Sequence, residues 1–217
     1  MATAIGYGLS YLYLFAVIFG VGLLKRKCLL PAEWSRKLVH IFVSFTWLIL
    51  YGFLFGTVHF IVIPASFVAV NFLSHKYGIF EMYERDGDEN DSCGTVLYAV
   101  SMTVMAIVST VRKDAVIPYG ISVFCLSFGD GAAALVGSSV TKCNLRLLGK
   151  KSLAGTVACS VFACLGIAIL GLFIPLDIAL WKVLLLGLWT GILELLSGSY
   201  DNLAIPLGTM LLSSVLL

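Results

Sequence analysis

Long runs of apolar residues, separated by short polar segments, dominate the chain. Eight such runs are long enough to cross a bilayer, or nearly so, at about 5–24, 38–56, 58–74, 94–111, 115–135, 153–174, 178–199 and 203–217. A simple helical crossing needs roughly 20 apolar residues. Because three of the runs are short, the pattern predicts a bundle of about eight transmembrane helices, with seven as the alternative.

Composition supports the same fold class. The chain has 217 residues, of which 60% are hydrophobic and only 12% are charged, whereas soluble domains carry about 25% charged residues. So few charges cannot form a soluble surface, so lipid must cover most of the protein. We therefore expect an all-α, polytopic membrane protein with a single domain over residues 1–217. The net charge of +2 is too small to indicate nucleic-acid binding.

The positions of the basic residues predict the topology. If the first helix ends at Lys25–Lys27 on the cytoplasmic side, the following helices alternate and only three of the 14 Lys and Arg residues fall on the other side: Arg112, Lys113 and Lys182. This bias is typical of the positive-inside rule. It predicts a multi-pass protein of the cell membrane, or of the endoplasmic reticulum in a eukaryote, whose polar site faces the cytoplasm.

Four polar clusters fall at the predicted cytoplasmic helix ends. Insertion scales give a cost of about 2.5–3.5 kcal/mol for an Asp, Lys or Arg at the centre of a membrane helix, so such residues usually have a function. The first cluster is Arg36, Lys37 and His40, which can share one helical face. Interfacial snorkelling would explain Arg36 and Lys37, but it does not explain His40.

The second cluster is the small-residue run FGDGAAALVG at 128–137, which includes Gly129, Asp130 and Gly137. Small residues allow a close approach of one backbone to another, or of a backbone to a phosphate. Helix packing needs no carboxylate, so Asp130 is a candidate ligand for Mg²⁺, which prefers one or two carboxylates together with phosphate oxygens.

The third cluster is GKKSLAGT at 149–156, where a basic loop becomes a helix. Ser152 is a candidate N-cap, and a helix N-terminus beside Lys150 and Lys151 can bind phosphate. The general excess of basic residues at the cytoplasmic ends of membrane helices explains Lys150 and Lys151 about as well. The spacing does not match a Walker A loop.

The fourth cluster is Glu194, near the end of a predicted helix, with Asp201 and Asn202 beyond it. The two carboxylates could complete a metal site with Asp130, or Asp201 and Asn202 could form a simple turn. Basic residues, three carboxylates and one histidine at one membrane face are the groups that phosphoryl transfer requires, since its catalysis is mostly positioning and charge neutralisation.

The set of motifs resembles one family. Over roughly residues 33–210, the chain is similar to the polyprenol kinases, which include the dolichol, phytol and CTP-dependent diacylglycerol kinases. The similarity is carried, in the family's order, by RKLVH (36–40), GTVLY (94–98), FGDGAAALVG (128–137), GKKSLAGT (149–156) and Glu194 followed by DNLAIPL (201–207).

The resemblance implies a membrane enzyme that moves the γ-phosphoryl group of a nucleotide, typically CTP, to a lipid hydroxyl with the help of Mg²⁺. Its nucleotide motifs match Asp130, Lys151 and Gly155, and its other recurrent positions match Arg36, Lys37, His40, Glu194, Asp201 and Asn202. The chain departs from the family at Gly131, Ala154 and the serines at 138–139. These departures concern details of nucleotide contact.

The resulting hypothesis assigns three overlapping sets of residues. The catalytic set is Asp130, Lys151, His40, Arg36 and Lys37, with His40 or a carboxylate as the base. The nucleotide-binding set is Gly129, Asp130, Gly137, Lys150, Lys151, Ser152, Gly155 and Asn202. The metal set is Asp130, Glu194 and Asp201.

The expected partners are CTP, membrane lipids and a lipid alcohol such as a polyprenol, phytol, farnesol or diacylglycerol. A cytidylyltransferase acting on a phospholipid would use similar groups. A small transporter is the alternative of a different class. The sequence selects neither one lipid alcohol nor an oligomeric state.

Overall fold

The computed structural model describes residues 1–78, 94–140, 145–148 and 151–217, and of Leu147 only the backbone. These residues are almost entirely α-helical, which confirms the predicted fold class. They form two compact units, Met1–Val116 and Ile117–Leu217, each with its own helix packing. A single domain over the whole chain stays a prediction.

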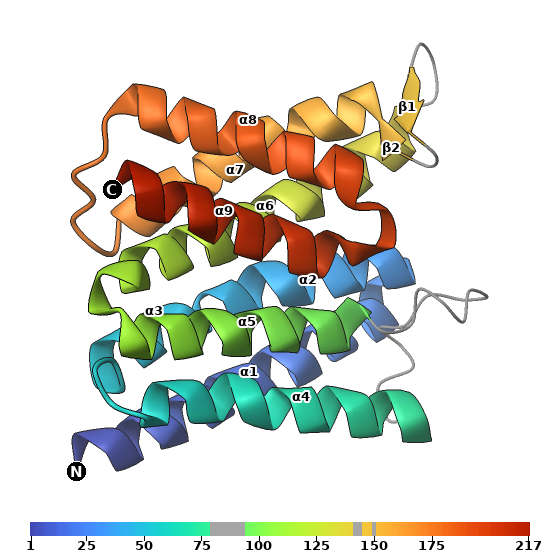
Figure 1. Cartoon of the computed structure of the whole chain (residues 1–217). Helices are drawn as coiled ribbons and strands as arrows, with labels where there is room; N and C mark the ends of the chain where they lie inside the picture. Colours follow the sequence, from blue (N-terminus) through green and yellow to red (C-terminus); the bar gives the residue numbers. More distant parts are fainter. Residues whose placement is uncertain (79–93, 141–144, 149–150) are drawn as a thin grey trace. The chain divides into compact units, whose positions relative to one another are not determined.

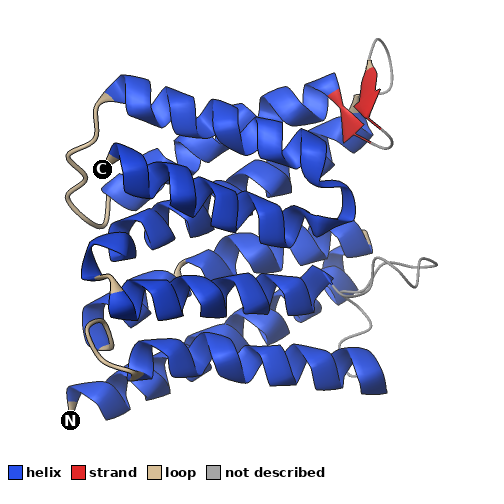
Figure 2. Ribbon diagram, viewed as in Figure 1, coloured by secondary structure: helices blue, strands red, loops and turns tan. Residues whose placement is uncertain are grey.

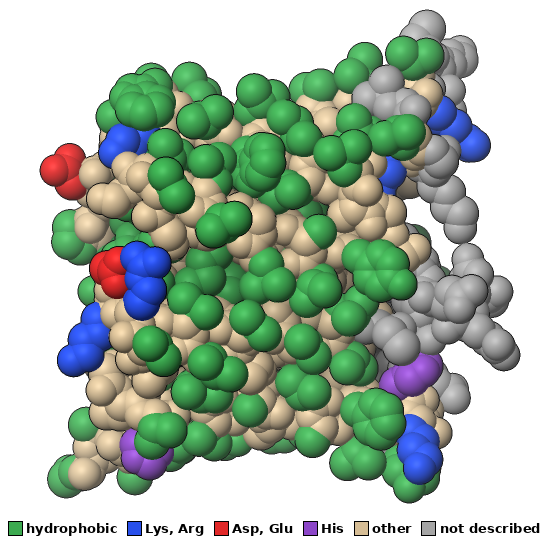
Figure 3. Space-filling model, viewed as in Figure 1, with side chains coloured by type: hydrophobic (Ala, Val, Ile, Leu, Met, Phe, Trp, Pro, Cys, Tyr) green, Lys and Arg blue, Asp and Glu red, His purple; other side chains and the backbone are tan. Residues whose placement is uncertain are grey.

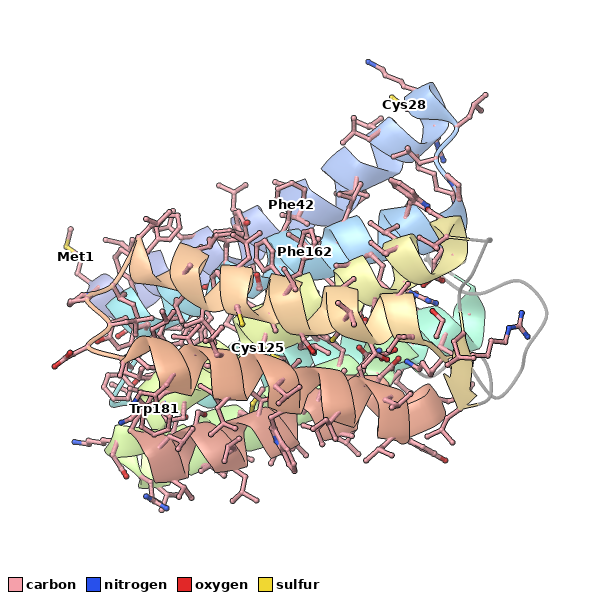
Figure 4. The ribbon with its side chains drawn as sticks, turned by 90° about the horizontal axis from the view of Figure 1, so that it is seen from above. Met1, Cys28, Phe42, Cys125, Phe162 and Trp181 are labelled. Atoms are coloured by element: carbon pink, nitrogen blue, oxygen red, sulfur yellow. The ribbon has the colours of Figure 1, made fainter. Side chains whose placement is uncertain are left out.

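The first unit contains the helices α1 (Ala2–Cys28), α2 (Ala32–Ser44), α3 (Thr46–Phe53), α4 (His59–Tyr77), α5 (Gly94–Val111) and the short 3₁₀ helix η2 (Lys113–Ala115). Helix α1 packs against α2, α3 and α4, and α4 packs along α5 (Figure 1). In Figure 4, Met1 and Cys28 mark the two ends of α1.

Tyrosines of α1 connect this helix to its neighbours. The hydroxyl of Tyr11 donates to Ser66 Oγ at 2.9 Å, and the hydroxyl of Tyr7 lies 2.7 Å from His59 Nδ1. Both partners belong to α4. Because an unsatisfied polar group is expensive in a lipid-exposed helix, these bonds fix how α1 and α4 face each other.

The predicted membrane helix at 38–56 is not one continuous helix. It begins earlier, at Ala32, and is divided at Phe45 into α2 and α3. Before the break, the hydroxyl of Ser44 donates to the carbonyl of Ile41 at 2.6 Å, and the Phe45 N–H donates to the carbonyl of Phe42. A serine hydroxyl bonded back to its own helix, followed by a tightened turn, bends a helix.

The second unit contains α6 (Val116–Ser139, starting one residue before the unit), β1 (Arg146–Leu148), β2 (Lys151–Ser152), α7 (Leu153–Gly171), α8 (Leu180–Ser197), the 3₁₀ helix η3 (Gly198–Tyr200) and α9 (Asp201–Leu216). The two strands form an antiparallel hairpin that pairs Arg146 with Ser152 and Leu148 with Lys151 (Figure 2). The sequence predicted only a basic loop here. The hairpin leads Lys151 directly into α7.

Small residues bring α6 and α7 together backbone to backbone. A Cβ added to Gly166 would lie 2.7 Å from the carbonyl oxygen of Phe124, and one on Gly155 would lie 3.1 Å from that of Ala133. A Cβ on Gly129 would lie 3.0 Å from the carbonyl oxygen of Cys159. The glycine-rich motif of α6 therefore serves close helix packing, as small residues do in membrane proteins. Figure 4 shows Cys125 of α6 among the side chains of this unit.

Large apolar side chains face outward on the same helices. One exposed stripe follows α7 at steps of four residues: Leu153, Val157, Val161 and Leu165. On the face seen in Figure 3, hydrophobic side chains cover the helices, and most charged side chains in view lie toward helix ends. Small residues inside and large apolar residues outside suit helices that are surrounded by lipid.

Six helical segments among the described residues are long and apolar enough to cross a membrane, and the last of them, Leu180–Leu216, comprises α8 and α9. The protein is therefore a helical, multi-pass membrane protein. The exact number of crossings, eight or seven, stays a prediction, because α2 and α3 are each too short to count among the six.

The α6–α7 contact yields a stability prediction. Gly166→Ala should lower the free energy of unfolding by about 1–3 kcal/mol, because the new methyl group meets a backbone oxygen that cannot move aside. The matched control is Gly20→Ala in α1, where a Cβ would meet nothing within 4 Å. Thermal unfolding in detergent measures both, and equal Tm values for the two variants would contradict the packing described here.

Candidate active site

Three charged side chains meet at one end of the second unit, and we call Lys151, Glu194 and Asp201 the charge cluster. The Nζ atom of Lys151 lies 2.8 Å from Glu194 Oε1 and 3.4 Å from Asp201 Oδ2. The lysine comes from β2, the glutamate from the last turn of α8, and the aspartate from the first residue of α9. One ammonium group therefore joins two carboxylates from separate helices.

The charge cluster is largely shielded from solvent. The side chain of Glu194 is 4% exposed, and those of Lys151 and Asp201 are 20% and 19% exposed. Burial lowers the pKa of Lys151, but the charges of Asp201 and Glu194, and to a smaller extent Asp130, together raise the pKa above its ordinary value of 10.5. Lys151 is thus cationic at neutral pH.

Asp130 lies close enough to the charge cluster to act on Lys151 electrostatically. Its position follows from the packing of α6 on α7. A Cβ on Gly137 would lie 3.3 Å from Ser152 Oγ and 3.6 Å from the Cα atom of Gly155, so the end of α6 contacts the start of α7. Asp130 is 3% exposed. Within this unit the structure thus brings Asp130 and Lys151 to the same region.

The start of α7 has the predicted cap. The hydroxyl of Ser152, which is the N-cap residue, accepts a hydrogen bond from the Gly155 N–H at 3.2 Å. This confirms the role expected for Ser152 and satisfies one N–H group of the first turn. The positive end of the helix dipole then lies beside Lys151.

Asp201 makes two contacts at the start of α9, one with the backbone and one with Lys151. Its Oδ1 atom accepts a hydrogen bond from the Asn202 N–H at 2.9 Å, at the start of α9, while Oδ2 contacts Lys151. A carboxylate in the first turn of a helix is favourable. Asn202 is 7% exposed and lies directly beside the charge cluster in sequence.

The donor chemistry of this region fits a divalent cation. Carboxylate oxygens are the ligands that Mg²⁺ prefers, and two carboxylates here already share one cationic partner. Among the residues that the structure describes, no three His, Cys, Asp or Glu side chains are arranged as a metal site. The assignment of Asp130, Glu194 and Asp201 as metal ligands stays a prediction.

The basic motif of the first unit forms a second polar group on α2. Arg36 Nη2 lies 2.5 Å from Glu33 Oε2, and Lys37 Nζ lies 4.0 Å from Glu33 Oε1. The ring of His40 packs against the ring of Tyr98, with centroids 4.6 Å apart. The motifs RKLVH and GTVLY therefore meet within this unit. That they share a site with the charge cluster stays a prediction.

Sequence reasoning assigned no function to two residues that the structure brings into these groups. Glu33 lies three and four positions before Arg36 and Lys37, and that helical spacing could have identified it. Thr156 donates a hydrogen bond to Glu194 Oε2 at 3.1 Å from another helix, a contact that spacing alone does not show. Lys150 lies outside the described residues. The expected nucleotide contacts of Gly129, Gly137 and Gly155 also stay predictions.

Fold and site together define a helical membrane protein with a charge cluster formed by β2, the end of α8 and the start of α9. Over 219 aligned residues, the chain is 29% identical to a phytol kinase from Synechocystis sp., and the match covers 96% of this chain and 90% of that kinase. The similarity confirms the predicted relationship to the polyprenol and phytol kinase family. No family model and no solved structure matches the chain.

The charge cluster yields a prediction that does not depend on activity. Lys151→Met should lower the free energy of unfolding by about 3 kcal/mol, because it leaves a buried carboxylate without its cation. The double variant Lys151→Met/Glu194→Gln should recover part of this loss, since the amide carries no charge. Thermal unfolding in detergent gives the comparison.

The control for this prediction is Arg112→Met. Arg112 also pairs with a carboxylate, Asp114, but both side chains are mostly exposed, at 61% and 68%. Its removal should change Tm little, because exposed ion pairs contribute little to stability. For the charge cluster, the Tm loss of the double variant Lys151→Met/Glu194→Gln is compared with those of Lys151→Met and Glu194→Gln alone. A loss in the double variant as large as the sum of the two single losses would contradict the contact between Lys151 and Glu194.

Proposed function

We propose that this protein transfers the γ-phosphoryl group of CTP to the hydroxyl group of a lipid alcohol at the cytoplasmic face of a membrane. The observation that supports the proposal most is the charge cluster at a capped helix N-terminus, where the Glu194 carboxylate is buried and the charge of Asp130 also acts on Lys151. The relationship to a phytol kinase supports the reaction class.

The residues of the second unit suit the nucleotide. Lys151 and the N-terminus of α7 bind phosphate oxygens and neutralise their charge. Gly129, Gly137, Lys150, Ser152, Gly155 and Asn202 complete the nucleotide site in this proposal. Asp130, Glu194 and Asp201 hold Mg²⁺, which supplies further charge neutralisation on the phosphates when it is bound.

The catalytic set predicted from the sequence also contains Arg36 and Lys37, whose charges would stabilise the negative charge that the phosphoryl group carries during transfer. A bond forms between the lipid oxygen and the γ-phosphorus as the bond from that phosphorus to the β–γ bridging oxygen breaks. CDP leaves, and the hydroxyl proton goes to His40 or to one of the carboxylates.

The assay uses purified protein in nanodiscs with CTP labelled at either the α- or the γ-phosphate, with ATP for comparison. The lipid acceptors are phytol, farnesol, a longer polyprenol and diacylglycerol, with phosphatidic acid as a further substrate. Lipid phosphate that carries the γ-label, together with released CDP, is the expected result. Transfer of the α-label to phosphatidic acid with release of pyrophosphate would instead identify a cytidylyltransferase, and no turnover of any nucleotide would refute both.

The variant that tests the site is Asp130→Asn. It should lower kcat by at least about 100-fold, because removal of one preorganised electrostatic group commonly costs about 10²–10³ in rate. The amide keeps the shape of the side chain, so the protein should still purify folded. Asp114→Asn is the control, since its side chain is 68% exposed and pairs with Arg112 outside the proposed site. Full activity of Asp130→Asn would refute the role of Asp130.

A further inference from the structure

The carboxylate of Glu194 has a separate donor for each of its two oxygens. Lys151 Nζ lies 2.8 Å from Oε1, and the hydroxyl of Thr156 donates to Oε2 at 3.1 Å. The residue is 3% exposed. Because one donor comes from β2 and the other from α7, the plane of the carboxylate is fixed relative to both elements.

The packing of α7 on α8 holds Thr156 within reach of Glu194. A Cβ on Gly191, one turn before Glu194, would lie 3.0 Å from the carbonyl oxygen of Thr156 and would collide with the hydroxyl of Ser160. A Cβ on Gly187 would lie 2.7 Å from the carbonyl oxygen of Ser160. These two glycines let the helices approach closely, and Thr156 is the residue of α7 that then meets the carboxylate.

A carboxylate bonded through one oxygen alone turns about its terminal bond. Without the hydrogen bond from Thr156, the Glu194 carboxylate could turn so that both of its oxygens contact Lys151. Lys151 would be less available to a phosphate group as a result. With the Thr156 hydroxyl on Oε2, only Oε1 faces the ammonium group, which Asp201 shares. Thr156 thereby holds Oε2 while Lys151 contacts Oε1. Its branched side chain has few rotamers, which suits this role.

We propose that Thr156 is a positioning residue that sets the orientation of the Glu194 carboxylate for phosphoryl transfer. The proposal rests on the function proposed above. Thr156 touches neither substrate in this proposal, because it acts through Glu194. Outer residues that orient a ligand or catalytic group commonly change activity by about 10–100-fold.

The test compares Thr156→Val, Thr156→Ser and Thr156→Ala by steady-state kinetics with CTP. Thr156→Val keeps the shape but lacks the hydroxyl, and it should lower kcat by about 10–100-fold with little change in the KM for CTP. Thr156→Ser keeps the hydroxyl and should restore most of kcat. Thr156→Ala should show the same loss as Thr156→Val, and it replaces that variant if Thr156→Val is not recovered folded.

The matched control is Thr190→Val on α8. Thr190 is fully buried, and its hydroxyl donates to the carbonyl of Leu186 and lies 3.4 Å from the hydroxyl of Thr209, so it serves packing alone. It should lower Tm without lowering kcat. If Thr190→Val and Thr156→Val lose kcat equally, or if Thr156→Ser restores nothing, the positioning role is overturned.

A measurement without turnover completes the test. In thermal unfolding, the losses of Thr156→Val and Glu194→Met should be less than additive in the double variant, because each variant removes the bond between the Thr156 hydroxyl and Glu194 Oε2. Additive losses would overturn the inference. If the wild-type protein transfers no phosphoryl group, the proposed function fails and the positioning role fails with it. An active wild type with an unchanged Thr156→Val refutes the positioning role alone.

Discussion

The pairing of the Lys151 ammonium with two carboxylates is the interaction on which the second unit depends. A charged group taken out of water costs several kcal/mol, and only a partner in good geometry offsets that cost. Glu194 is almost fully buried, so it requires both Lys151 and the hydroxyl of Thr156. The positions of β2, α7 and α8 at this end of the unit are therefore coupled to one another.

Close helix packing makes this pairing possible. Glycines on α6 and α8 allow α7 to approach both helices at distances that a side chain would prevent. The α6 glycines Gly129 and Gly137 lie in the same motif as Asp130. Small residues and charged residues thus serve one purpose, since lipid offers no hydrophobic drive between helices and packing must bring the polar groups together.

The sequence predicted the local features well. The apolar runs and the low charge content predicted a helical membrane protein, and Ser152 is the N-cap that its position before an apolar run indicated. The division of α2 from α3 at Phe45 was missed, because it depends on the Ser44 hydroxyl bonding back to its own helix, within an unbroken apolar pattern. The β1–β2 hairpin was missed because its strands are short and lie in a basic segment.

The candidate site was predictable in its residues but not in its contacts. Clustering of Asp130, Lys151, Glu194 and Asp201 was inferred from their common membrane face, and in the second unit Lys151 contacts Glu194 and Asp201 and is also affected by the charge of Asp130. Which atom bonds to which could not be inferred, because periodicity describes one helix at a time. Thr156 was part of a recognised motif, yet its partner lies 38 positions away on another helix.

Asp201 shows how one carboxylate can contribute to the start of a helix and to the charge cluster together. Glu194 and Asp201 lie on either side of the turn at Gly198, whose φ of 58° is a conformation that glycine adopts readily and other residues rarely. The reversal at this turn starts α9 at Asp201, where one oxygen of the carboxylate bonds to the backbone of the new helix and the other contacts Lys151. Turn chemistry therefore positions the second carboxylate of the charge cluster. A residue with two acceptor oxygens can stabilise a helix start and a buried cation together, so a structural role for Asp201 does not argue against a functional one.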